Sequence, residues 1–214
     1  MKTLFTLSTI ALVVSLMACS GAEQSSSISS TQESSESKTL QQQGDVNNEL
    51  AAMDVSKDYH SYANPEEILV THLNLDLRAD FEVKKLIGSV QINIEGQKEN
   101  ANELILDTRG LSIINVTSEG SKIPFELKEA DENLGAALHI QLPSGADKVS
   151  IDYETSPSAS GAQWLTPEQT AGKKHPFLFT QAQAVHARSF IPLQDSPQVR
   201  VTYNATITTP KSLL

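Results

Sequence analysis

The sequence predicts an all-β domain, either an antiparallel β-sandwich or an open barrel, behind a long polar segment. Between residues 58 and 214, apolar and polar residues alternate over short stretches, as in strands that bury one face. The stretches recur about every ten residues and are separated by Gly, Asn, Asp, Pro and Ser, which is typical of sandwiches and barrels. No long apolar stripe at helical spacing follows residue 58, so we expect very little helix.

Residues 69–81 and 84–96 give the two clearest strands. In each, apolar residues recur at every second position and polar residues occupy the other side. The stretch 82–85 between them is a predicted hairpin link. We expect the buried side to carry Leu69, Thr71, Leu73, Leu75, Leu77, Ala79 and Phe81 in the first strand, and Leu86, Gly88, Val90, Ile92 and Ile94 in the second.

Shorter strands follow along the rest of the chain. They are predicted at residues 103–107, 111–120, 122–128, 137–143 and 148–155. A last strand is predicted near the carboxyl end, where Val199, Val201, Tyr203, Ala205 and Ile207 alternate with polar residues.

The first residues predict a secretory signal. Lys2 precedes an apolar run from Leu4 to Met17 that is too short for an ordinary transmembrane helix. The run ends in Leu-Met-Ala-Cys at residues 16–19, which resembles a bacterial lipobox. Residues 1–18 are therefore expected to be a lipoprotein signal peptide and Cys19, the only cysteine, the lipidated residue that anchors the chain to a membrane. The alternative is an ordinary cleavable signal with an incidental cysteine.

Residues 19–57 are predicted to be a disordered tether. They are rich in Ser, Gln, Asn and Glu and cannot bury enough apolar surface to offset the entropy of ordering. Ser20 follows the cysteine, and by resemblance to other lipoproteins it favours the outer membrane of a Gram-negative-type bacterium, facing the periplasm. The net charge of −10, with few basic clusters, argues against a nucleic-acid partner.

The five histidines do not predict a metal site. They are scattered at residues 60, 72, 139, 175 and 186, without the short spacings of zinc motifs and without a second cysteine. His72 and His139 fall on the polar sides of their strands, where a solvated imidazole is expected.

The densest group of functional side chains lies at residues 180–197. Gln181 and Gln183 stand two residues apart, so in an extended segment both side chains leave from one face. They can then point together at a ligand, or at each other. Amides do not exchange protons near neutral pH, so the pair can bind but cannot act as acid and base.

Several longer stretches carry a family resemblance. Residues 62–67, 71–90, 104–113 and 153–197, the last with the only tryptophan, resemble the amino-terminal β domain of zinc metallo-aminopeptidases of the aminopeptidase N type. The match is to the leukotriene hydrolase/aminopeptidase B branch. It implies a saddle-like antiparallel domain at residues 58–214. Because that domain continues for further strands in the family, we expect it to be incomplete at its carboxyl end.

The resemblance also implies roles for individual residues. In the family, a Thr-Gln-x-Gln/Glu element borders the catalytic cleft and binds the amino-terminal residue of the peptide, which makes Gln181 and Gln183 the substrate-binding candidates. Arg188 and Asp195 match the rest of the signature, and we expect them to brace the loop by an ion pair rather than to contact substrate. Trp164 is expected at the edge that faces the cleft, either as a buried anchor or in contact with a ligand.

The family reaction needs zinc, bound by His-Glu-x-x-His and a later glutamate. This motif and the Gly-x-Met-Glu-Asn substrate loop do not occur in the 214 residues. We therefore expect an amino-terminal fragment of an envelope-anchored aminopeptidase, inactive alone, whose zinc lies in a catalytic domain of the same polypeptide and whose substrates are peptides. The alternative is a non-catalytic, tethered β-sandwich binding lipoprotein.

Overall fold

The computed structural model describes residue 54 and residues 57–213, so the predicted signal peptide, Cys19 and nearly all of the predicted tether lie outside the described residues. Within the described part, strands predominate and the helical elements are single 3-10 turns. No helix in this part is long and apolar enough to span a membrane. The elements are β1 (Ile68–Asp80), β2 (Lys85–Gly96), β3 (Glu103–Thr108), β4 (Ser112–Ser118), β5 (Ser121–Lys122), β6 (Phe125–Leu127), β7 (Ala136–Gln141), β8 (Lys148–Glu154), β9 (Ala162–Leu165), η1 (Pro167–Gln169), β10 (Phe177–Thr180), η2 (Ala187–Ser189), β11 (Thr202–Thr208) and η3 (Lys211–Leu213).

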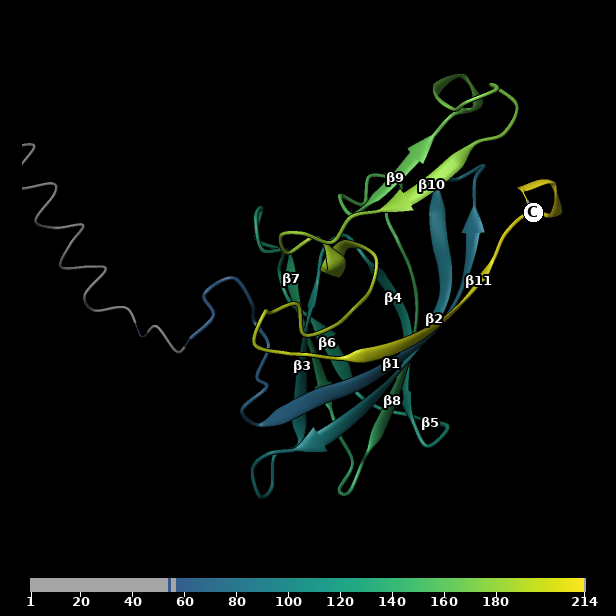
Figure 1. Cartoon of the computed structure of the whole chain (residues 1–214). Helices are drawn as coiled ribbons and strands as arrows, with labels where there is room; N and C mark the ends of the chain where they lie inside the picture. The colour runs from purple at the N-terminus through teal and green to yellow at the C-terminus, as the bar shows by residue number, and fades with distance from the viewer. Residues whose placement is uncertain (1–53, 55–56, 214) are drawn as a thin grey trace, which may run out of the picture. The chain divides into compact units, whose positions relative to one another are not determined.

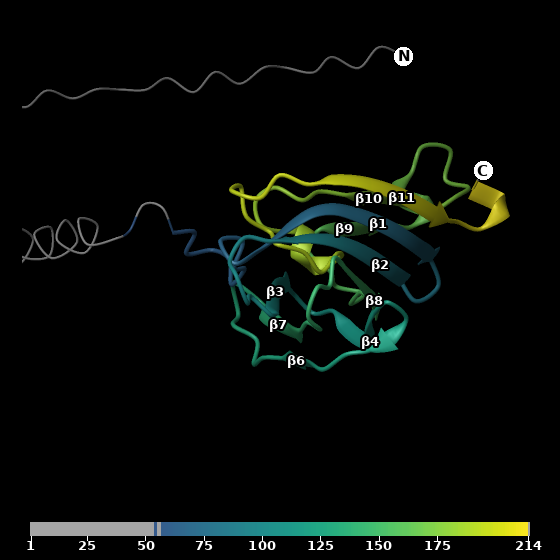
Figure 2. The same ribbon diagram turned by 90° about the horizontal axis from the view of Figure 1, so that it is seen from below.

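Two sheets pack face to face and enclose the core. The larger has the strand order β11-β1-β2-β8-β4-β5, and the smaller has the order β3-β7-β6. Figure 2 shows them as two layers, with β1, β2 and β11 on one side and β3, β6 and β7 on the other. Fully buried aliphatic residues from both layers fill the space between them, among them Val90, Ile151, Leu106 and Leu138. The predicted all-β sandwich is confirmed, because the alternating stretches supply one apolar face to each sheet.

Strands β1 and β2 form the predicted hairpin, but the predicted buried face is wrong at its start. A β-bulge lies between Val70 and His72, where the pairing with β2 shifts by one residue. On the amino-terminal side of the bulge the buried residues are Ile68 and Val70. Leu69 and Thr71 therefore do not share the buried face with Leu73 and the alternate residues that follow it.

Strand β11 differs from the antiparallel expectation because it pairs with β1 in parallel, from His72 with Thr202 to Arg78 with Thr208. It forms an edge of the larger sheet (Figure 1), and all seven of its residues are exposed. Tyr203 and Ile207 keep 69 % and 47 % of their surface accessible. The alternation in this stretch thus predicted the strand correctly, but neither face of β11 is buried by the described residues.

The buried side chain of Gln194 continues the edge of β1 beyond the first residue of β11. Its Oε1 accepts a hydrogen bond from Val70 N at 3.0 Å, and its Nε2 donates to Ile68 O at 2.8 Å. The amide thus satisfies the same backbone groups that a neighbouring strand would satisfy.

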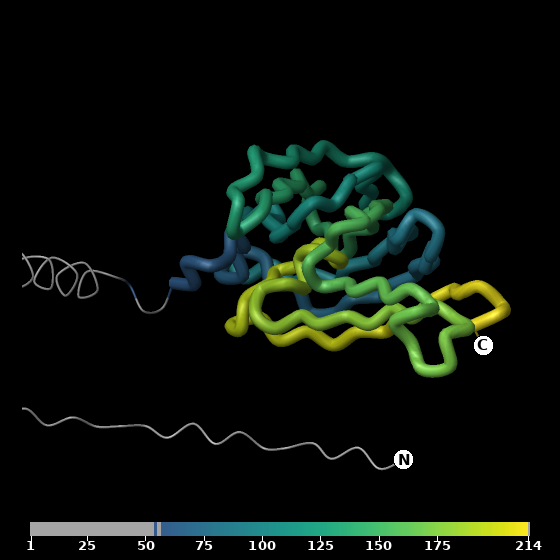
Figure 3. The backbone as a smooth tube through the Cα atoms, turned by 90° about the horizontal axis from the view of Figure 1, so that it is seen from above, coloured from purple at the N-terminus to yellow at the C-terminus, as the bar shows by residue number. Residues whose placement is uncertain are grey.

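A third sheet has only two strands and shares no strand with the sandwich. Strands β9 and β10 pair antiparallel, from Ala162 with Thr180 to Leu165 with Phe177. Its loop lies at the same end of the molecule as the described carboxyl end, as Figure 3 shows in green and yellow. The segment that follows β10, residues 181–201, connects this hairpin to β11 and contains the predicted binding residues.

Candidate functional site

Gln181 and Gln183 lie in a turn directly after β10, which ends at Thr180. Gln181 N donates to Gly161 O at 2.9 Å, and the side-chain Oε1 of Gln181 accepts from Gln183 N at 3.1 Å. Both residues are exposed, and the Gln183–Ala184 peptide bond is cis. Because both residues follow the end of β10, their side chains do not share a strand face, as an extended segment would require. One amide instead contacts the backbone of the other residue.

The end of this turn is fixed by the backbone. His186 N donates to Ala182 O at 2.9 Å, and Val185 has a φ of 56°, a conformation that is unusual for a β-branched residue. The turn then runs into η2, whose Arg188 and Ser189 are buried. The exposed amides are thus presented from a short segment with buried residues at its base.

Arg188 forms the base of this segment. The fully buried guanidinium donates from Nε to Asp195 Oδ2 at 3.0 Å, and from Nη2 to Asp195 O at 2.9 Å. It also donates from Nη1 to Leu134 O at 3.0 Å and from Nη2 to His60 O at 2.8 Å. These bonds tie η2 to three other parts of the chain. The structure therefore contains the expected Arg188–Asp195 ion pair, and both residues point into the fold.

Asp107, the residue before the last in β3, is a buried partner that the sequence analysis did not identify. Its carboxylate has no exposed surface and lies 3.6 Å from Arg188 Nη1. It accepts from Tyr62 N at 2.8 Å, from Ser61 Oγ at 2.5 Å and from Asp195 N at 3.0 Å. The sequence does contain a sign of this role, because Asp107 directly follows the apolar run Leu-Ile-Leu, and a charge next to a buried run is normally paired.

Two close contacts hold the turn against the sandwich. Gly161 N donates to Ser189 Oγ at 2.8 Å, and a Cβ at Gly161 would lie 2.6 Å from His186 O. Tyr153 Oη donates to Phe190 O at 2.9 Å, and burial raises the pKa of the Tyr153 hydroxyl far above its usual value. The neutral hydroxyl therefore remains a donor across the physiological range.

Trp164, on β9, packs against the core rather than beside the two amides. Its ring meets Phe81 edge-on, with centroids 5.1 Å apart, and its Nε1 is buried without a hydrogen-bond partner. On the same hairpin, Phe177 and Phe179 of β10 are exposed, with ring centroids 6.4 Å apart. The packing of Trp164 favours the buried-anchor alternative.

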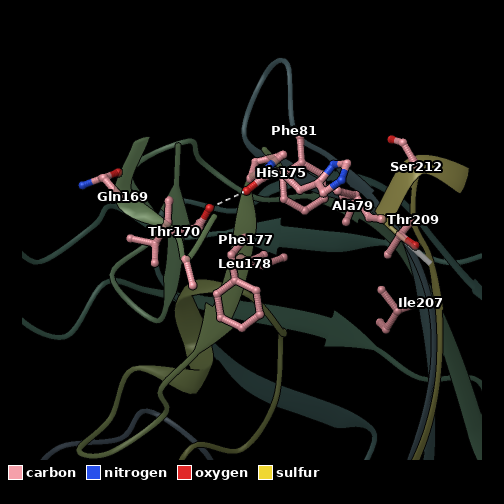
Figure 4. A pocket seen from close by; sticks show the side chains of 14 residues that line it. Ala79, Phe81, Gln169, Thr170, His175, Phe177, Leu178, Ile207, Thr209 and Ser212 are labelled. Carbon is pink, nitrogen blue, oxygen red and sulfur yellow. Dashed lines mark hydrogen bonds between the residues drawn. The ribbon is translucent and has the colours of Figure 1, made fainter. Parts of the chain in front are cut away.

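An apolar groove of about 800 Å³ lies between the hairpin and strands β1 and β11. Figure 4 shows Phe81, Phe177, Leu178 and Ile207 around it, with Thr170 Oγ1 donating to His175 O at 2.8 Å. Leu165 and Leu213 also belong to its apolar lining. Gln181 and Gln183 do not line it.

The described residues do not fit a zinc ion. Among them, no group of three or more His, Cys, Asp or Glu side chains could hold a metal. The histidines have other contacts: His139 Nδ1 lies 3.1 Å from Glu103 Oε1, and His72 Nδ1 lies 2.6 Å from Thr202 Oγ1. What the site offers is an exposed pair of amides on a braced turn, which can donate and accept hydrogen bonds but cannot supply Lewis-acid or proton-transfer chemistry.

The family model and the related proteins that match this chain point to the same family of peptidases. The profile of the Peptidase M1 N-terminal domain matches residues 69–214. Leukotriene A-4 hydrolase of Xenopus laevis is 40 % identical over 162 residues, which are 73 % of this chain and 27 % of that protein. Leucine aminopeptidase 2 of Pyricularia oryzae is 37 % identical over 161 residues, 72 % of this chain and 26 % of that protein. The chain thus spans about a quarter of the length of these relatives.

Solved structures show the same fold. Yeast LTA4 hydrolase in complex with bestatin superposes with a TM-score of 0.68 at 34 % identity, over 74 % of this chain and 26 % of that one. An M1 zinc metallopeptidase from Deinococcus radiodurans superposes with a TM-score of 0.54 at 17 % identity, over 72 % of this chain and 35 % of that one. The second similarity shows the fold alone.

Proposed function

The chain belongs to the family of peptidase M1 N-terminal domains, and from this premise we propose that it is the amino-terminal part of a zinc aminopeptidase that removes amino-terminal residues from peptides. In this proposal Gln181 and Gln183 contact the amino end of the substrate. The zinc and the catalytic groups come from a catalytic domain of the same polypeptide. The relative named leucine aminopeptidase 2 supports the reaction class, and the resemblance to zinc metallo-aminopeptidases implies the zinc.

The observation that carries the proposal is the exposed pair of amides on a turn with a buried ionic base. Exposed glutamines are ordinary on a surface, but here the turn rests on η2, where Arg188 has no accessible side-chain surface and donates to three other parts of the chain. A rigid base keeps the entropy cost of ordering the amides on binding small. The turn above η2 therefore fits a ligand-binding role better than that of an ordinary solvated loop.

The chemistry of an amide fits the amino end of a peptide. Its oxygen accepts from an ammonium group, and its nitrogen donates to a peptide carbonyl. Both candidates are neutral, so neither gives the charge-assisted bond that a glutamate at position 183 would give. We infer that recognition of the ammonium depends on further acidic groups, and that Gln183 broadens the selectivity of this site.

We further propose that the mature protein is anchored in the cell envelope through a lipidated Cys19, in the outer membrane facing the periplasm. The lipobox-like stretch at residues 16–19 and the serine at position 20 support this. Incorporation of labelled palmitate into the wild-type protein, and its loss in Cys19→Ser, tests the anchor. Equal labelling of both proteins would contradict it.

The test of function uses the complete polypeptide that the reading frame encodes. Zinc content and hydrolysis of amino-acid arylamides are measured for wild type, Gln181→Ala, Gln183→Ala and Gln183→Glu. Loss of one neutral hydrogen bond raises KM about three- to tenfold. Gln97→Ala is the matched control, because Gln97 is an exposed glutamine that follows β2 and its side chain makes one long bond, 3.4 Å, to Glu95 O.

The outcomes separate the candidate functions. Zinc-dependent turnover with a raised KM in the two alanine variants, and an unchanged KM in Gln97→Ala, supports the proposal. A complete polypeptide without zinc and without arylamidase activity refutes it in favour of a tethered binding protein. Identical selectivity profiles for wild type and Gln183→Glu refute the inference about selectivity alone.

A further inference from the structure

His186 ends the turn that carries Gln183, and its side chain is held by two other segments. Its Nδ1 lies 2.9 Å from Ser160 Oγ, just before β9, and 3.4 Å from Arg109 Nη1, just after β3. Its backbone N donates to Ala182 O, and its backbone O accepts from Ser189 Oγ at 2.7 Å. Side chain and backbone of one residue thus connect the turn to three neighbouring parts of the chain.

The identity of these partners indicates the role of Nδ1. A guanidinium group has only donors, so the nitrogen that faces Arg109 must accept. The hydroxyl of Ser160 then donates to the same Nδ1. Nδ1 thus acts as the acceptor in both contacts.

Arg109 is itself held in place. Its backbone N donates to Arg188 O at 2.8 Å, and its Nη2 donates to Asn133 O. The guanidinium thus spans from the loop after β6 to the turn, while its backbone pairs with η2. Arg109 is therefore held by bonds that do not involve Gln181, and it can position the His186 side chain without it.

We propose that His186 is a positioning residue for substrate binding: its Nδ1, held by Ser160 and Arg109, fixes the turn that presents Gln183. This inference rests on the proposed role of Gln183. Two attachments define the turn, the bond from Gln181 N to Gly161 O at its start and the anchored His186 at its end. When the second attachment is lost, Gln183 samples several positions, and the substrate must bear the cost of ordering it.

The test compares His186→Ala and His186→Asn in the complete enzyme. Asparagine keeps an acceptor, Oδ1, close to the position of Nδ1, and so restores the bonds from Ser160 and Arg109. His186→Ala is expected to raise KM about five- to tenfold with kcat nearly unchanged, because the lost interactions act on binding. His186→Asn is expected to restore KM to within about twofold of wild type. Amide hydrogen exchange over residues 182–186 should rise in the alanine variant and return in the asparagine variant.

A double-mutant cycle separates positioning from a general loss of structure. If His186 acts through Gln183, the His186→Ala change raises KM in wild type and has no further effect in a Gln183→Ala background. Ser160→Ala is the second variant, because Ser160 is exposed and its loss removes one partner without altering the turn itself. It is expected to raise KM about threefold.

Each result decides the proposal. A normal KM in both His186→Ala and Ser160→Ala, together with a raised KM in Gln183→Ala, overturns the positioning role and leaves the proposed function intact. An equal rise of KM with and without Gln183, or no restoration by asparagine, also overturns it. An unchanged KM in Gln183→Ala overturns the proposed function and this inference together.

Discussion

Replacing Arg188 with lysine keeps a positive charge in the core but removes the planar fork of donors. The guanidinium makes four side-chain hydrogen bonds, to Asp195 Oδ2, Asp195 O, Leu134 O and His60 O. An ammonium group has three donors on a single atom, so it cannot reach acceptors on all sides of a flat group. At least one charge-assisted bond is lost, and one buried carbonyl is left without its donor.

The expected cost follows from these contacts. A hydrogen bond to a charged group contributes about 1.5–3 kcal/mol. Loss of one to two such bonds gives a decrease of about 3 kcal/mol in the free energy of unfolding for Arg188→Lys. Arg188→Met also leaves the fully buried Asp107 carboxylate without its counter-charge, and the loss of one partner of a buried pair costs about 3–5 kcal/mol.

Urea unfolding of residues 58–214, followed by tryptophan fluorescence, measures this cost, since Trp164 is the only tryptophan and packs against the core. The midpoint should fall while the m-value stays constant. For a domain of this size, 3 kcal/mol corresponds to a decrease in Tm of roughly 6–12 °C. Arg78→Lys is the matched control, because Arg78 is half exposed and pairs with Asp80 at the surface, where such pairs contribute about 1 kcal/mol or less.

A decrease of less than about 1 kcal/mol in the free energy of unfolding of Arg188→Lys would refute this expectation. The expectation would also be refuted if Arg188→Met were no worse than the lysine variant, since the buried carboxylate would then not need a counter-charge.

Three further predictions concern stability. Gly135 and Gly145 have similar φ, 81° and 78°, but a Cβ at Gly135 would lie 2.1 Å from Thr108 O, whereas one at Gly145 meets nothing within 4 Å. We therefore expect Gly135→Ala to lower the free energy of unfolding by about 1–3 kcal/mol more than Gly145→Ala, as measured by thermal melting. Equal decreases in the two variants would contradict the clash. Burial raises the pKa of Tyr153, so its neutral hydroxyl contributes stability that is fully present below the unfolded-state pKa and is lost as pH rises toward the folded-state pKa. Tyr153→Phe should therefore cost about 1 kcal/mol at neutral pH and reduce the loss of stability above pH about 10, and an unchanged alkaline limb in urea titrations would count against this. The hydrogen bond from Arg78 and the backbone N–H groups of Val83 and Glu82 lower the pKa of Asp80 from 3.8. The ionised carboxylate therefore contributes stability that is present above pH 3.8 and is lost as pH falls through the lower folded-state pKa. Asp80→Asn should thus reduce the loss of stability at acid pH, and a loss as steep as that of wild type would exclude the effect.

Local patterning was enough to predict the strands of the two larger sheets and the hairpin between β1 and β2, but not β9 (Ala162–Leu165) and β10 (Phe177–Thr180). Alternation reports which residues of a strand share a face, and residues 103–107 accordingly coincide with β3 almost to the residue. It does not report the partner strand. The parallel pairing of β11 with β1 and the bulge after Val70 depend on contacts between distant segments, and neither could be predicted from one stretch alone.

The candidate site was predictable in its residues but not in its geometry. Gln181 and Gln183 were identified by resemblance, and whether they bind substrate stays a prediction. The assumption of an extended segment failed because β10 ends at Thr180 and the chain turns. Asp107 is important because Arg188 folds against it. His186 is important because Arg109 and Ser160 contact its side chain. Such pairings arise in tertiary structure and leave little trace in sequence spacing.

The amide of Gln194 has a consequence for how the larger sheet assembles. Strand β11 carries Thr, Asn, Tyr and Ile without a charged residue, and a ladder of this kind can slide by two residues with little change in the side chains on each face. Gln194 already holds the backbone of Ile68 and Val70. A β11 displaced toward that end of β1 would have to expel a buried amide and leave its polar atoms without partners. One side chain thus opposes a shift of the last strand toward the amino-terminal end of β1.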